Sequence, residues 1–88
     1  MNNWNIGLMR TCFACPQQYD AFLGDRQVGY LRLRHGRFTV EFPDCRGKLI
    51  YEAEPRGDGI FERDEEEHYL EMAKRAIIRE LKESEDNE

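Results

Sequence analysis

The sequence predicts an α+β fold, an antiparallel β-meander of four to five strands packed against one C-terminal amphipathic helix. Apolar and polar residues alternate at period two in several short runs between residues 4 and 53, a pattern typical of half-buried strands. Residue pairs that contain Gly, Pro or Asp separate these runs, and such pairs favour tight turns. Residues 64–82 instead repeat apolar residues at steps of three and four, which indicates a helix with one buried face.

A length of 88 residues suits one domain with a single thin core. We predict one domain over residues 1–83 and a disordered acidic tail over residues 84–88, because the tail has no apolar residue to anchor it. A thin core leaves little room for an enclosed cleft, so a groove or a flat face is the more natural binding surface.

The first strand is predicted over residues 4–13, in which every second residue from Trp4 to Leu8 is apolar. Pro16 lacks a backbone donor and should end this strand. A turn or short irregular segment is therefore expected through Gln17 and Gln18.

Two hairpins are predicted next. Residues 19–23 and 28–34 should pair around the turn Gly24-Asp25, and residues 37–42 should return from a second turn at His35-Gly36. Gly tolerates positive φ, and His is enriched in the left-handed region relative to most residues, so both pairs suit two-residue turns.

Counting outward from His35-Gly36 gives a register in which Leu33 faces Phe38 and Leu31 faces Val40. The apolar positions then share the face predicted to be the core: Leu31, Leu33, Phe38, Val40 and Phe42. The remaining positions share the face predicted to be largely exposed to solvent: Tyr30, Arg32, Arg34, Arg37, Thr39 and Glu41.

A short strand near an edge of the sheet is predicted over residues 48–53. The segment from Pro55 to Gly59 holds one Pro and two Gly and reads as a loop. The two apolar residues that follow it, Ile60 and Phe61, are expected to dock the loop onto the core.

Asp64 followed three residues later by Glu67 resembles a capping box, so the helix is expected to begin at Asp64. Residues 1–55 carry a net charge of +1 and residues 56–88 one of −6, so the acidity belongs to the helix and its surroundings. The acids gather at the loop-to-helix junction: Asp58, Glu62, Asp64, Glu65, Glu66 and Glu67. They either compensate the helix dipole or meet a basic partner.

Cys12 and Cys15 form a C-x-x-C pair, a spacing at which two thiolates bind one zinc ion. Cys45, with His35 as the candidate fourth ligand, would complete a tetrahedral set. The alternative is that the cysteines are small apolar residues, which leaves the protein without a cofactor. A thioredoxin-like role is disfavoured, because the pair precedes Pro16 rather than opening a helix.

The candidate binding site is the basic part of the exposed face: Tyr30, Arg32, Arg34 and Arg37. The planar guanidinium groups of arginine can bind phosphate oxygens, and an aromatic ring beside them can stack on a base. The net charge of −5 opposes nucleic-acid binding, which draws its affinity from neutralising many phosphates. An ordinary solvated face is the alternative interpretation.

The sequence shows no nucleophile with a partner base, no P-loop and no G-x-G-x-x-G motif, so no enzyme is indicated. We therefore expect a non-enzymatic module that binds a protein partner. The alternative is a nucleic-acid-binding module of sheet plus helix, with zinc as a stabiliser. Three cysteines without a secretory signal favour a location in the cytoplasm. No apolar run is long enough to span a membrane, so no membrane partner is expected. An edge strand would allow the protein to form a homodimer.

Overall fold

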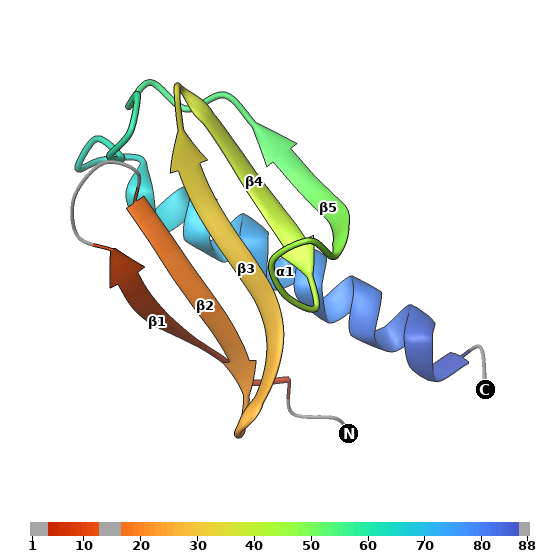
Figure 1. Cartoon of the computed structure of the whole chain (residues 1–88). Coiled ribbons are helices and arrows are strands. Elements are labelled where there is room, and N and C mark those ends of the chain that lie inside the picture. Colours follow the sequence, from red (N-terminus) through yellow and green to blue (C-terminus); the bar gives the residue numbers. More distant parts are fainter. Residues whose placement is uncertain (1–3, 13–16, 87–88) are drawn as a thin grey trace.

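A five-stranded sheet covered on one face by one helix forms the protein (Figure 1). The computed structural model describes residues 4–12 and 17–86. The elements are β1 (Ile6–Cys12), β2 (Gln17–Leu23), β3 (Arg26–Arg34), β4 (Arg37–Phe42), β5 (Lys48–Ala53) and α1 (Glu66–Asp86). All strands pair antiparallel in chain order. The predicted α+β meander is therefore confirmed, with β1 and β5 as its edges.

The hairpin of β3 and β4 has the predicted turn and register. His35 and Gly36 have φ angles of 54° and 73°, and positive φ at both central residues is the geometry of a two-residue turn whose twist matches its strands. Leu33 pairs with Phe38 and Leu31 with Val40. The core and exposed faces of this hairpin consequently follow the predicted alternation.

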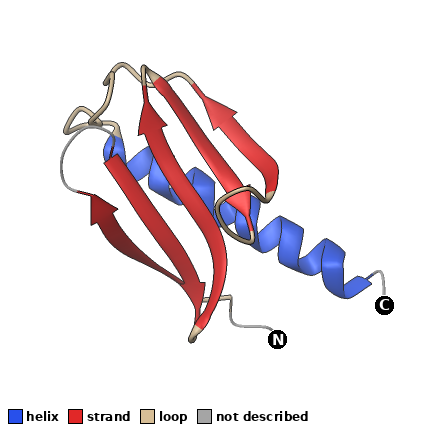
Figure 2. Ribbon diagram, viewed as in Figure 1, coloured by secondary structure: helices blue, strands red, loops and turns tan. Residues whose placement is uncertain are grey.

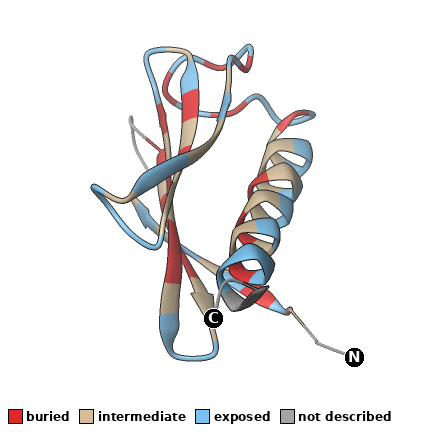
Figure 3. Cartoon of the chain, turned by 90° about the vertical axis from the view of Figure 1, so that its right-hand side faces the viewer, coloured by how far each residue is buried: buried red, intermediate tan, exposed pale blue. Residues whose placement is uncertain are grey.

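The helix covers one face of the sheet and leaves the other open (Figures 2 and 3). Its buried positions, Ala73, Ile77 and Leu81, recur every four residues and therefore lie on one side of α1. They pack on strand residues that are fully buried, which include Leu31, Leu33, Phe38 and Val40. Within the described residues no helix has the length and apolar character that crossing a membrane requires.

The loop between β5 and α1 docks through one of its two apolar residues. Phe61 is 7% exposed, and its ring lies 5.0 Å from that of Phe38 and 5.8 Å from that of Tyr69. Ile60 is 48% exposed, so its predicted docking was wrong. The aromatic cluster holds Phe61 inward, and the preceding side chain is turned toward solvent.

The helix begins differently from the prediction. The backbone N–H groups of Glu65 and Glu66 donate to the Glu62 carbonyl oxygen, at 3.0 and 3.2 Å, and the Glu62 N–H donates to the Glu65 side chain at 2.9 Å. This reciprocal pair lies two residues before the predicted capping box of Asp64 and Glu67. The predicted box was wrong because Asp64 is an ion-pair partner of Arg56 instead.

The helix continues to Asp86, three residues into the segment for which a disordered tail is predicted. No Gly or Pro follows Gly59 in the chain, so no residue that breaks a helix interrupts it there. Residues 87–88 lie outside the described residues, as do residues 13–16, which include Cys15 and the predicted end of the first strand.

Candidate functional site

The three predicted arginines come together on the open face of the sheet. Arg34 of β3 lies directly opposite Arg37 of β4, and Arg32 lies two residues away on the same face, opposite Thr39. With His35 they line a shallow hollow of about 310 Å³ beside the β3–β4 turn. We refer to Arg32, Arg34 and Arg37 as the arginine cluster.

The arginine cluster has an excess of positive charge. Like charges directly opposite one another across two strands destabilise a sheet. Arg37 forms an ion pair with Glu52 of β5, whereas the ion pairs formed among the described residues include neither Arg32 nor Arg34. Two guanidinium groups thus remain available for an anion from outside.

Tyr30 adjoins the cluster but has acidic neighbours. It pairs with Asp20 of β2 on one side and with Glu41 of β4 on the other. Its pKa is raised, mainly by burial; the charge of Arg32 lowers the pKa, and Cys45, Glu41 and Asp20 raise it further. The ring is therefore half-buried between carboxylates, a poor setting for stacking on a nucleic-acid base.

The structure separates two of the predicted zinc ligands. His35 lies just before β4 and the exposed Cys45 lies just after it. A strand of six residues spans about 20 Å, so one ion cannot contact both side chains. Cys12 is half-buried at the end of β1. Among the residues with described positions, no group of three or more His, Cys, Asp and Glu side chains is arranged to hold a metal ion.

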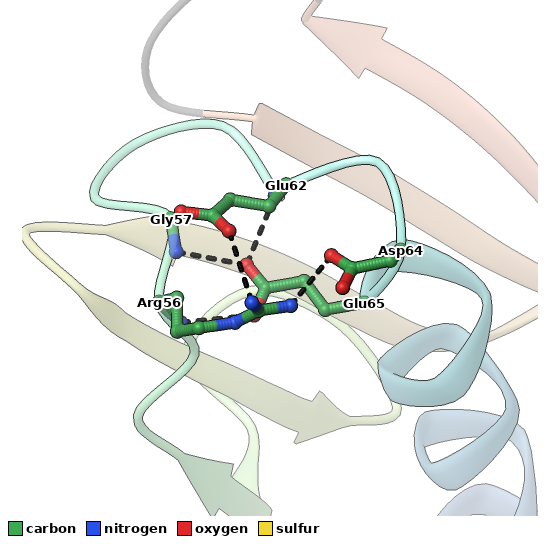
Figure 4. Close-up of polar contacts among 5 residues, drawn as sticks. All are labelled: Arg56, Gly57, Glu62, Asp64 and Glu65. Atoms are coloured by element: carbon green, nitrogen blue, oxygen red, sulfur yellow. Dashed lines mark hydrogen bonds and ion pairs between the residues drawn. The ribbon is translucent and has the colours of Figure 1, made fainter.

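The acidic loop-to-helix junction is organised around Glu65, which is 6% exposed (Figure 4). Its carboxylate accepts hydrogen bonds from the backbone N–H groups of Arg56 at 2.9 Å, Gly57 at 2.8 Å and Glu62 at 2.9 Å. Burial alone would raise the pKa of Glu65, but these three hydrogen bonds and the charge of Arg56 outweigh it, so the pKa is lowered.

Arg56 neutralises much of this acidity. Its guanidinium nitrogens lie 2.5 Å from Asp64, 3.4 Å from Glu62 and 3.6 Å from Glu65 (Figure 4). The hydrogen bond from Arg56 is the main cause of the lowered pKa of Asp64. Three carboxylates of the junction therefore have partners within the protein, which makes this surface a structural connection more than a free acidic patch.

A polar network that the sequence did not indicate joins β2 to the helix. The Gln17 side chain is 1% exposed; its Nε2 donates to the Tyr19 hydroxyl at 2.5 Å and to Glu66 Oε2 at 2.7 Å. The Tyr19 hydroxyl also donates to Glu66 Oε2, at 2.6 Å. Burial, followed by the hydrogen bond with Glu66, raises the pKa of Tyr19 to about 12.

This network corrects the predicted turn at residues 17–18, because β2 begins at Gln17. Gln17 Oε1 accepts from the Phe61 N–H at 2.9 Å, and the Gln17 N–H donates to the Gly59 carbonyl at 2.9 Å. An amide with all these partners can be buried at little cost. The one sequence signal for a strand that begins at Gln17 was the period-two alternation, which continues back from Tyr19.

Comparison with known proteins identifies no relative from which a function could be inferred. No family model matches the chain, and neither the curated proteins nor the solved structures give a match. Of the two charged surfaces, the junction is occupied by internal contacts and the arginine cluster is open. The arginine cluster is therefore the candidate site.

Proposed function

We propose that this protein is a non-enzymatic interaction module that binds an acidic segment of a protein partner at the arginine cluster. The observation that supports this most is the placement of Arg34 opposite Arg37 with Arg32 beside them, on a sheet face that α1 leaves uncovered. A like-charge arrangement of this kind is relieved when carboxylates approach it. We place this binding in the cytoplasm, without a cofactor, as the cysteine content suggests.

The chemistry of the cluster suits carboxylates. A guanidinium group offers parallel N–H donors in a fixed fork that matches the two oxygens of Asp or Glu. Arg32 and Arg34 extend from alternate positions of one strand, about 7 Å apart along it. That spacing equals the repeat of same-side residues in an extended peptide, so a segment with alternating acids would match both.

A protein partner is favoured over nucleic acid by the surroundings of the cluster. Among the described residues the hollow is lined by three arginines, and Asp20 and Glu41 flank the neighbouring Tyr30. A phosphate backbone would be repelled by these acids, whereas a short acidic peptide can avoid them. The nucleic-acid alternative is retained as an outcome of the test.

The test is binding of a synthetic extended peptide with alternating Glu and Ala, followed by NMR of the backbone amides. We expect shifts centred on residues 30–41. Replacing Arg34 by Glu should weaken binding at least about tenfold, since hydrogen bonds to charged groups contribute about 1.5–3 kcal/mol. Arg79→Glu is the matched control, because Arg79 is exposed on the helix and the net charge changes equally.

Three outcomes would contradict the proposal. Equal weakening in Arg34→Glu and Arg79→Glu would mean that the peptide responds to general charge, and an affinity that Arg34→Glu leaves unchanged would mean that it does not bind at the arginine cluster. A short single-stranded oligonucleotide that binds residues 30–41 more tightly than the peptide, with an affinity that falls steeply with salt, would establish the nucleic-acid alternative instead.

A further inference from the structure

The two edges of the sheet differ in their charge. At β5 the exposed residues Lys48 and Glu52 lie along the edge, and Lys48 forms an ion pair of 2.9 Å with Glu80 of α1. At β1 the single charged residue is Arg10, which lies opposite Tyr19 and so belongs to the helix-facing side. No described segment lies beyond β1 (Figure 1). On its open side this edge carries no charged side chain, and it presents backbone groups to which another strand can bond.

Hollows lie on both sides of β1. On the open face of the sheet, a hollow is lined by Met9, Gly7 and Phe22, and Met9 is 60% exposed. On the other side, Leu8 and Leu70 line an opening between β1 and α1. Successive side chains of a strand point to opposite faces, so a strand added at this edge would send alternate side chains into the two hollows.

We infer that the added strand is β1 of a second copy of this chain, paired antiparallel about a two-fold axis. The sequence of β1 fits both hollows, since Ile6 and Leu8 lie on the helix side and Met9 on the open side. The pairing covers the regular stretch Ile6–Arg10, because a bulge interrupts β1 between Arg10 and Cys12. One sheet then runs through both copies.

The charges around the inner opening support a second copy as the occupant. Its rim carries both signs, with Arg63 and Lys74 beside Glu67 and Glu71. A two-fold interface places one surface patch against the same patch of the other copy. A rim of mixed sign can then pair cations with anions, whereas a rim of one sign would repel itself.

The test is sedimentation velocity over a range of protein concentrations, combined with hydrogen exchange. We expect a monomer–dimer equilibrium, and slower amide exchange within residues 6–10 at concentrations that favour the dimer. Met9→Lys should raise the dimer dissociation constant at least about tenfold, because the two lysines then lie diagonally across the paired strands on the same open face, where like charges repel. Leu49→Lys is the matched control, since Leu49 is an exposed apolar residue of the other edge.

Several results would overturn the inference. A chain that stays monomeric at every concentration, or a dimer that Met9→Lys leaves intact, would exclude the β1 interface. A dimer lost in Leu49→Lys would assign the contact to β5. Protection of residues 6–10 that requires an added peptide would show that the edge serves a different partner.

Discussion

Glu65 is the residue on which the connection between the β5–α1 loop and the helix depends. The first N–H groups of a helix and the amides of the loop before it have no intrahelical partners. One nearly buried carboxylate satisfies three such amides at once, those of Arg56, Gly57 and Glu62. Its removal would leave these donors without an acceptor in a place that water reaches poorly.

Replacing Glu65 by Gln should lower the free energy of unfolding by about 2 kcal/mol, since hydrogen bonds to charged groups contribute about 1.5–3 kcal/mol. Glutamine keeps the size but has one acceptor oxygen, and its NH₂ group would face backbone donors. Glu67→Gln is the control: Glu67 is exposed, and its replacement should change stability by less than about 0.5 kcal/mol. Urea unfolding at pH 7 measures both.

The same comparison should depend on pH. Because the pKa of Glu65 is lowered on folding, its contribution is fully present above the ordinary value of 4.5 and is lost as the pH falls through the lower, folded value. The stability difference between the wild type and Glu65→Gln should therefore shrink in acid. A difference that stays constant down to pH 3 would argue against the charged form as its source.

At the scale of elements, α1 packs closely against the sheet at Gly29 of β3. A Cβ atom at this position would lie 2.6 Å from Ile77 Cδ1 and 3.2 Å from Ala21 Cβ. Both neighbours are fully buried, so neither has free space to move into. Gly29 thus sets how closely the helix and the sheet can pack.

Gly29→Ala should destabilise the protein by about 1–3 kcal/mol through overpacking. Ile77→Val, which removes Cδ1, should cost about 0.5–1.5 kcal/mol alone through the space it leaves. Together the two changes should cost less than their sum, because the deleted methyl makes room for the added one. Thermal unfolding of the three variants measures this coupling, and strict additivity would show that α1 moves away instead.

The elements that could be predicted from the sequence are those defined by near neighbours. The hairpin of β3 and β4 depends on two turn residues and on alternation, so its register followed directly. The start of β2 and the helix cap depend on contacts between distant residues: Gln17 reaches the Phe61 N–H 44 residues away and Glu66 49 residues away. No local pattern carries such information.

At the scale of the whole molecule, the candidate site was predictable only in part. The register alone brought Arg32, Arg34 and Arg37 together. The acidic flanks of Tyr30 include Asp20 of β2, whose pairing with β3 passes a bulge that the sequence does not announce. The proposed zinc set required His35 and Cys45 to meet, and the length of β4 separates them.

Alkaline unfolding should report on the network that joins β2, the loop and α1. With a pKa raised to about 12 from 10.0, Tyr19 stays protonated in the folded state after it has ionised in the unfolded one. Its contribution is full below pH 10 and is lost as the pH rises toward 12. Tyr19→Phe should therefore be less stable at pH 8 but lose stability less steeply above pH 10. Equal slopes would place the tyrosine outside the network.

Gln17 has a consequence for motion. Its one side chain bonds to the loop at Phe61, to its own strand at Tyr19 and to the helix at Glu66. Lifting the loop from the sheet would leave the buried amide of Gln17 without its hydrogen-bond partner in the loop. It would also expose the start of the helix. The loop therefore cannot open independently as a lid. Instead, β2, the loop and the beginning of α1 open together as one cooperative unit.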